Sequence, residues 1–308
     1  MTSRRYHGFI DDSDRWNELD LRDGDIIIDT PPKCGTTWMQ MCCALLIFQQ
    51  PELPRPLSDL SPWVDMLTWP IDELVALLDA QTHRRFMKTH TPLDGVPWDP
   101  KLTYICVGRD PRDAMLSMES HMANMDMNAV LAAREKAVGL DDLDPSQMPT
   151  PPPDDPIERF WWWVDDRSPA DARVLGLAGV LEHLQTFWDR RDEPNVALFH
   201  YSDLRADLDG QMRRLAHVLD IEVPGHRWDE LVHAASFAEM KQRADVLVPD
   251  LEHGIWHDNS QFFDQGRSGR WHALIGDDAL PRYDARVAEL VSPELAHWAH
   301  HGWLDSPA

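Results

Sequence analysis

The sequence predicts an α/β fold in a single domain, with a central parallel sheet flanked by helices. Four short apolar segments have the composition of strands, and helical stretches separate them: 25–29, 85–89, 102–107 and 196–201. This alternation favours a parallel sheet, because the helices between parallel strands cover both of its faces. The 308 residues can bury one large core, and nothing indicates a repeat or a second domain, so we expect one domain over residues 1–308.

The first predicted strand leads into a loop with the composition of a phosphate cradle. Residues 32–38 contain a glycine, a lysine and two threonines, and a helix without breakers follows up to Pro51. In such loops backbone N–H groups, hydroxyls and the positive end of the helix converge on an anion. The Walker A pattern places lysine directly after its second glycine, whereas Lys33 lies two residues before Gly35. Since no apolar strand ends in a convincing Walker B aspartate, we expect a P-loop-like site that holds phosphate or sulfate without a metal.

The sequence of residues 32–38, Pro-Lys-Cys-Gly-Thr-Thr-Trp, resembles the 5′-phosphosulfate loop of the sulfotransferases that use 3′-phosphoadenosine 5′-phosphosulfate (PAPS). Cys34 stands where this family usually has serine, and a loop-filling role is a simpler interpretation than a reactive thiol. Trp38 corresponds to an adenine-stacking residue, although a tryptophan that opens a helix is equally a core candidate. The resemblance assigns six residues to the donor: Lys33, Cys34, Gly35, Thr36, Thr37 and Trp38.

A lysine and a histidine, separated by one threonine, lie at the end of the second predicted strand. Residues 86–92 contain Lys88 and His90 and resemble the family's Lys-[Thr/Ser]-His segment, whose histidine is the catalytic base. The chain has 15 histidines, and only its position between two binding motifs distinguishes His90. An imidazole titrates near neutrality and can take a proton from a hydroxyl. The resemblance makes His90 the base, while Lys33 and Lys88 neutralise charge on the transferring group and its leaving phosphate.

The third predicted strand is followed by an arginine motif at residues 109–117, Arg-Asp-Pro-Arg-Asp-Ala-Met-Leu-Ser. This motif is similar to the family's 3′-phosphate motif. Pro111 opens a helix and Ser117 returns about two turns along it, so that Arg109 and Ser117 can hold one phosphate. A surface loop in which Asp110 caps a helix is common by itself, but the order of the two motifs favours the binding role.

Two weaker similarities concern the adenine side of the donor. Residues 199–204 resemble the family's Tyr-Glu-Asp segment, which assigns Tyr201 to the adenine site. Residues 235–241 resemble a Ser-Phe-x-x-Met-Lys segment, which assigns Ser236, Phe237 and Met240 to the same site. Each segment alone is more typical of a strand end or a packing helix.

The C-terminal similarity contains the main departure from the family. Residues 262–271 resemble Phe-x-Arg-Lys-Gly-x-x-Gly-x-Trp, but an aspartate and a glutamine replace the basic pair at 264–265. The 3′-phosphate thereby loses one or two cationic contacts. We expect the N–H of Gly266 to bind, with Arg267 or Arg270 replacing the lost charge.

Charge and cysteine content restrict the partners and the compartment. The formal net charge is −24, which disfavours nucleic acid and anionic lipid as partners and requires a local basic cluster for an anionic donor. The four cysteines lack the spacing of a metal site or a disulfide framework. The N-terminus has no apolar core of a signal peptide, and no stretch approaches the ~20 apolar residues of a membrane span. We therefore expect a cytoplasmic protein without a metal.

Residues 122–157 change in character, from a Met- and Asn-rich stretch to an acidic and then a proline-rich one. This composition predicts a mobile insertion. In the sulfotransferase fold such segments lie over the acceptor pocket, so it is either a lid or a plain solvated loop. Aromatic side chains cluster at 160–163 and at Trp63, Met66 and Trp69. Helical core is the simplest interpretation of both groups, but a pocket for an apolar or ring-shaped acceptor also needs such walls.

These similarities together predict a PAPS-dependent sulfotransferase. It would move a sulfuryl group to a hydroxyl or amine of a small-molecule acceptor, whether aromatic, lipid or sugar, and release adenosine 3′,5′-bisphosphate. Two alternatives stay open. The departure at 264–265 supports a catalytically silent nucleotide-binding or scaffold protein on the same fold, and the displaced lysine argues against a P-loop kinase. The oligomeric state stays open too, because the dimer motif of many cytosolic relatives is not found after Trp271.

Overall fold

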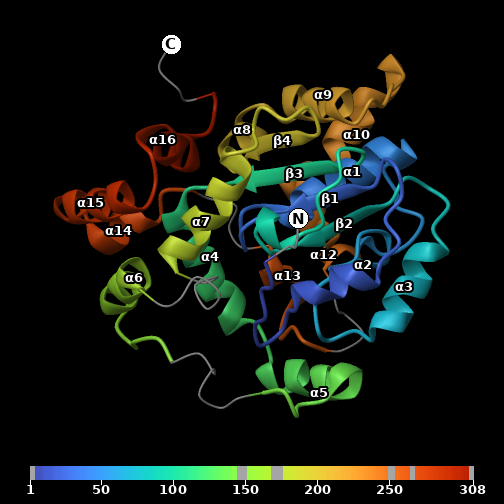
Figure 1. Ribbon diagram of the computed structural model, residues 1–308. Coiled ribbons are helices and arrows are strands. Elements are labelled where there is room, and N and C mark those ends of the chain that lie inside the picture. Colours follow the sequence, from blue (N-terminus) through green and yellow to red (C-terminus); the bar gives the residue numbers. More distant parts are fainter. Residues whose placement is uncertain (1–3, 144–150, 168–175, 249–253, 264–267, 305–308) are drawn as a thin grey trace.

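The computed structural model describes residues 4–143, 151–167, 176–248, 254–263 and 268–304. Its centre is a sheet of four strands (Figure 1) in the order β2-β1-β3-β4, and each neighbouring pair is parallel. The predicted parallel sheet is confirmed. The strands are β1 (Ile26–Asp29), β2 (Phe86–Thr89), β3 (Thr103–Gly108) and β4 (Val196–His200). Each predicted strand differs from the observed one by a single residue at one or both ends, and Tyr201 begins a helix instead of ending the fourth strand.

Helices follow each strand and cover the sheet. Two of them carry predicted binding motifs: α1 (Thr36–Phe48) follows β1, and α4 (Pro111–Ala123) follows β3. The other helices are α2 (Leu57–Leu60), α3 (Ile71–Asp79), α5 (Met127–Val138), α6 (Pro156–Asp165), α7 (Leu177–Trp188), α8 (Tyr201–Ala206), α9 (Leu208–Val218), α10 (Trp228–Ala234), α11 (Phe237–Gln242), α12 (Ala244–Leu247), α13 (Asn259–Phe262), α14 (Trp271–Ile275), α15 (Leu280–Leu290) and α16 (Pro293–His301). Short 3₁₀ turns lie at Ser13–Glu18, Leu93–Gly95, Gly225–Arg227 and Asp277–Ala279.

The two faces of the sheet bury two separate cores. Side chains alternate along a strand, so Ile26 and Ile28 of β1 face one layer and Ile27 faces the other. The first layer contains α1, α9 and α10, and the second contains α3, α7 and α16. All four residues of β1 are buried, as expected for a central strand covered on both faces. The continuous apolar run that predicted this strand is therefore a consequence of its position.

The segment 122–157 contains more regular structure than a plain loop. It includes α5, which lies at the periphery of the molecule in Figure 1. The carboxylate of Asp126 caps this helix by accepting from the N–H of Asn128 at 2.9 Å. Arg134 of α5 is fully buried and donates to the carboxylate of Asp142 and the carbonyl of Phe9. Local capping and one buried arginine thus stabilise a helix within this stretch, and its mobility stays a prediction; residues 144–150 lie outside the described residues.

No helix in the described part of the chain is long and apolar enough to cross a membrane.

Candidate functional site

The carboxyl edge of the sheet brings the three predicted motifs together. Because β2, β1 and β3 are parallel neighbours, the residues that follow them emerge at one edge. Arg109, after β3, donates from Nη1 to the carbonyl oxygen of Lys33 at 2.8 Å. His90, after β2, contacts the carbonyl oxygen of Thr30 through Nδ1 at 2.7 Å. The loop after β1 is therefore held from both neighbouring strands.

The backbone of this loop has a conformation that only certain residues tolerate. Gly35 is the N-cap of α1 and has a φ of 108°, in the left-handed region that favours glycine. A Cβ atom at Gly35 would also lie 3.2 Å from the ring of Tyr201. Lys33 has a φ of 67° although it is not glycine. Since Gly35 has no side chain to cap α1, the first N–H groups of the helix are left for a ligand.

Cys34 is buried within the loop. Its side chain has no exposed surface, and burial raises the pKa of its thiol to about 12. A thiol that stays protonated is a poor nucleophile. The loop-filling interpretation of Cys34 is therefore favoured over the reactive one.

Arg109 joins the loop to the predicted adenine side of the site. Its guanidinium lies 4.4 Å from the ring centroid of Tyr201, and its buried Nε has no hydrogen-bond partner among the described residues. Tyr201 in turn packs edge-on against Trp38, with 5.3 Å between the ring centroids. The indole N–H of Trp38 donates to the carbonyl of Ala235 at 2.8 Å. Ser117 lies on α4 and is 6% exposed. A buried guanidinium N–H without a partner is suited to an anion.

The remaining residues predicted to bind the donor have different positions. Ser236 caps α11 by accepting from the N–H of Glu239 at 3.3 Å, next to the residue that Trp38 contacts. Phe237 is partly buried and packs against Phe263, and Met240 is a core residue with 1% exposure. Gly266 and Arg267, with the departure at 264–265, lie outside the described residues.

The contacts of His90 determine its tautomer. A carbonyl oxygen can only accept a hydrogen bond, so Nδ1 of His90 carries the proton and donates to Thr30. The other ring nitrogen, Nε2, then has a lone pair. Burial, the Lys88 ammonium and more distant charges lower the pKa of His90 to about 3. His90 is therefore neutral near pH 7 and able to accept a proton at Nε2.

A buried carboxylate fixes the residues on both sides of His90. The hydroxyl of Thr89 donates to Oδ2 of Asp65 at 2.5 Å, and the hydroxyl of Thr91 donates to the same oxygen. Asp65 has no exposed surface. Sequence reasoning missed Asp65, because it belongs to no motif and lies 24 residues before Thr89.

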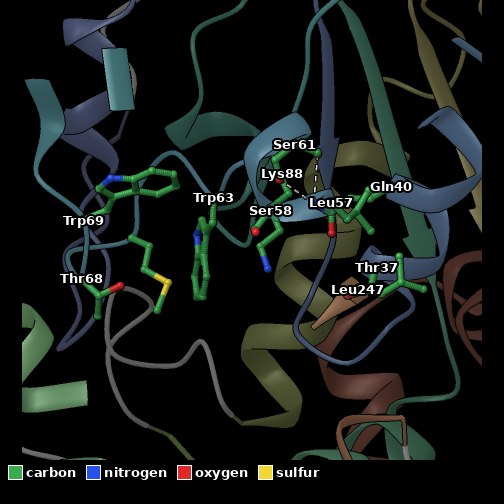
Figure 2. A pocket seen from close by; sticks show the side chains of 11 residues that line it. Thr37, Gln40, Leu57, Ser58, Ser61, Trp63, Thr68, Trp69, Lys88 and Leu247 are labelled. Atoms are coloured by element: carbon green, nitrogen blue, oxygen red, sulfur yellow. Dashed lines mark hydrogen bonds between the residues drawn. The ribbon is translucent and has the colours of Figure 1, made fainter. Parts of the chain in front are cut away.

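A pocket with aromatic walls adjoins Lys88. The Lys88 ammonium lies 4.9 Å from the ring centroid of Trp63, whose ring also packs edge-on against His90 at 4.8 Å. Figure 2 shows the indoles of Trp63 and Trp69 at one end of this pocket and Thr37 of α1 at the other. Met66 is a further lining residue. The helical-core interpretation is wrong for Trp63, Met66 and Trp69, since they lie in the irregular segment between α2 and α3.

The other aromatic group has the expected structural role. Phe160 and Trp163 of α6 are buried in the core layer that contains α7. Trp162 is 43% exposed. None of these side chains lines the pocket beside Lys88.

His121 is a second histidine at the site that sequence reasoning missed. It lies one turn after Ser117 on α4, and its Nδ1 is 3.0 Å from the Lys33 ammonium. The periodicity of the helix was the available signal, because residues four apart share a face. Within the described ranges, no cluster of three or more histidine, cysteine or acidic side chains has the arrangement of a metal site.

Comparisons with known proteins agree on one family. A family model described as a sulfotransferase domain matches residues 23–293. A glycolipid sulfotransferase of Mycobacterium bovis is 43% identical, over 98% of this chain and 96% of the relative. Mouse sulfotransferase 1B1 is 23% identical, over 91% of this chain and 86% of its own length.

Solved structures show the same fold. Mouse sulfotransferase SULT7A1 complexed with PAP superposes with a TM-score of 0.65 at 19% identity, over 93% of this chain and 90% of that one. Retinol dehydratase in complex with retinol and PAP gives a TM-score of 0.64 at 18% identity, over 90% of this chain and 83% of that one.

Proposed function

The chain belongs to the sulfotransferase family, and from that premise we propose that it transfers the sulfuryl group of PAPS to a hydroxyl or amine of a small-molecule acceptor. The observation that carries this proposal is the convergence of Lys33, His90 and Arg109 at one edge of the sheet. This arrangement combines an anion site with a base. The second product is adenosine 3′,5′-bisphosphate.

The donor site uses groups that are suited to two separate anionic ends. The loop of Lys33 and the N-terminus of α1 would bind the 5′-phosphosulfate. The Nε of Arg109, which has no partner within the described ranges, supports a second anion, the 3′-phosphate, for which Ser117 would supply a hydroxyl. Trp38 and Tyr201 would contact the adenine, and Ser236, Phe237, Met240, Gly266 and Arg267 stay predicted donor residues. Two similar solved structures are complexes with PAP, which supports this donor.

The transfer is a substitution at sulfur. The acceptor oxygen gives its proton to Nε2 of His90 and forms a bond to sulfur, while the bond between sulfur and the 5′-phosphate oxygen breaks. The electron pair of that bond stays on the phosphate. Lys33 and Lys88 stabilise the charge that develops on the phosphate and the sulfuryl oxygens. The proton on His90 then passes to solvent.

We further propose that the acceptor has a lipid part and a sugar hydroxyl. Relatives that are 43% identical over nearly the whole chain are named glycolipid sulfotransferases. The indoles of Trp63 and Trp69 provide apolar and ring-stacking surface beside Lys88 and His90. A net charge of −24 favours a neutral or cationic acceptor.

We also propose a cytoplasmic location, which the four buried free thiols support. The family model that matches residues 23–293 is a sulfotransferase domain, which argues against the kinase alternative. The relatives that are 43% identical are named as sulfotransferases, which argues against the silent-scaffold alternative. The donor-binding experiment described next also tests this alternative.

The first experiment is calorimetric titration with adenosine 3′,5′-bisphosphate in EDTA, with ATP as the control ligand. We expect binding of the bisphosphate without metal and no comparable binding of ATP. A sulfation assay with PAPS and a neutral glycolipid then tests the reaction. Absence of bisphosphate binding would contradict the proposal and favour a silent scaffold; preferential binding of ATP with Mg²⁺ would favour a kinase.

A further inference from the structure

The Lys33 side chain ends among rings from α4 and α13. Its ammonium lies 3.0 Å from Nδ1 of His121 and 4.9 Å from the ring centroid of Phe262. The His121 ring itself packs against Trp256 and Phe262, and its centroid lies 4.7 Å and 5.6 Å from theirs. A polar contact and an aromatic contact therefore help to direct this flexible side chain.

The hydrogen bond to Lys33 requires neutral His121. An ammonium group can only donate, so Nδ1 of His121 is the acceptor and the ring proton is on Nε2. Burial, together with the charges of Lys33 and Lys88 and the neighbouring His90, lowers the pKa of His121 well below its usual range. The imidazole keeps its lone pair for Lys33 under ordinary conditions.

The backbone around His121 is held in place. Asn124, just after α4, accepts from the N–H of His257 at 2.9 Å and donates from its side chain to the carbonyl of Asp258 at 2.8 Å. The N–H of Asp126 donates to the carbonyl of Ile255 at 2.8 Å. These bonds connect the end of α4 to the segment that carries Trp256 and Phe262. His121 thus has a fixed position from which to orient Lys33.

Lys33 is held at both of its ends by the same structural unit. Its carbonyl accepts from Arg109, two residues before α4, and its ammonium donates to His121 in the last turn of α4. The left-handed backbone of Lys33 is retained by this double attachment.

We propose that His121 is a positioning residue that fixes the Lys33 ammonium before the sulfuryl donor binds. This inference rests on the sulfuryl transfer proposed above. A lysine side chain has many rotamers, and ordering it during binding weakens affinity. A neutral acceptor at Nδ1 selects one arrangement beforehand without neutralising the charge that the anion needs. His121 therefore acts on the donor through Lys33.

Two substitutions separate the hydrogen bond from packing. His121→Asn places an amide oxygen near the position of Nδ1 and keeps an acceptor for Lys33. His121→Leu keeps a similar volume and has no acceptor. We expect His121→Leu to lower kcat/KM for PAPS about tenfold, the scale of ordering one long side chain, and His121→Asn to stay within about threefold of the original protein.

The readouts distinguish this inference from its premise. Calorimetry with adenosine 3′,5′-bisphosphate should show weaker binding for His121→Leu, with the acceptor KM unchanged. If the original protein does not bind the bisphosphate, the proposed function itself fails. If it binds and His121→Leu binds equally well, or if both variants lose activity alike, or if the acceptor KM changes instead, His121 does not position Lys33. Should the leucine variant unfold, His121→Ala provides the same comparison with the asparagine variant.

Discussion

The protonation of one nitrogen atom determines what His90 can do. Nδ1 donates to Thr30, so the lone pair is on Nε2. The lysines that lower the pKa of His90 also attract an anionic donor. Bound anions offset those positive charges, so we expect the pKa of His90 to be higher in the donor complex than in the free protein. Such a rise would make His90 a stronger base when the substrate is present.

The substitution His90→Asn tests the role of Nε2. An asparagine amide can donate to Thr30 as Nδ1 does, but it has no basic nitrogen. We expect kcat to fall by ~10²-fold or more, the usual scale for loss of a general base, with little change in bisphosphate affinity. Steady-state kinetics and calorimetry measure the two effects. A kcat close to that of the original protein would remove His90 from the mechanism.

Arg109 has a contact that lysine cannot reproduce. Its Nη1 is bonded to the carbonyl of Lys33, while Nε has no partner among the described residues. Arg109→Lys keeps the charge but loses the planar fork, so we expect the Kd for the bisphosphate to rise about tenfold or more. Arg213→Lys, at an exposed ion pair with Asp209, is the control. Equal affinities of the two variants would show that Arg109 does not bind the ligand.

At the scale of secondary-structure elements, neighbouring parallel strands place the motifs but do not orient them. The end of β2 is oriented by the loop between α2 and α3, through Asp65. The same loop supplies Trp63, which contacts both Lys88 and His90. One irregular segment thus provides both the support of His90, the proposed base, and a wall of the pocket.

Removal of the Asp65 carboxylate should loosen this arrangement. Asp65→Ala leaves two buried hydroxyls without their acceptor, and we expect a loss of about 3 kcal/mol in the free energy of unfolding. Asp65→Asn keeps one oxygen acceptor and should cost less than about 1 kcal/mol. Urea unfolding measures both, and kcat should fall in the same order. Equal stability of the two variants would contradict the role of the carboxylate.

At the scale of the whole molecule, buried titratable groups make stability depend on pH in two directions. Burial lowers the pKa of His200 to about 4, and it raises the pKa of Asp11 to about 7 and that of Asp29 to about 6. The histidine destabilises the fold as pH falls from 6.5 to 4, because only the unfolded state then gains its proton. The aspartates act in the opposite sense, since the folded state holds their protons more strongly.

His200→Gln isolates the histidine contribution. His200 is fully buried, donates from Nε2 to the carbonyl of Ala299 and accepts at Nδ1 from the N–H of Ser202. A glutamine amide can replace the first bond and does not titrate. Between pH 7 and pH 4 we expect the free energy of unfolding to fall by roughly 3 kcal/mol more in the original protein than in the variant. Identical pH profiles in urea unfolding would show that the pKa of His200 is the same in the folded and the unfolded state.

The convergence of much of the proposed donor site could be predicted from the sequence, because its residues directly follow strands. A buried parallel strand has a recognisable apolar run, and the residue after it must appear at the carboxyl edge of the sheet. Lys33, His90 and Arg109 meet for this reason. Local spacing likewise predicted α4, since Asp110 and Pro111 are typical of a helix start and the structure has them as N-cap and first residue.

The sequence by itself therefore determined the sheet, the phosphate loop and the order of the motifs, all of which depend on neighbours along the chain. Only the tertiary structure decided which groups orient and surround them. Asp65 and Trp63 reach the site from a loop whose position follows from packing, and packing leaves no fixed spacing in the sequence. His121 shares a face of α4 with Ser117, but only the tertiary structure brings it to the Lys33 ammonium. The tertiary structure also decided the burial of Cys34 and the lowered pKa of His90, because both result from the exclusion of water by distant segments.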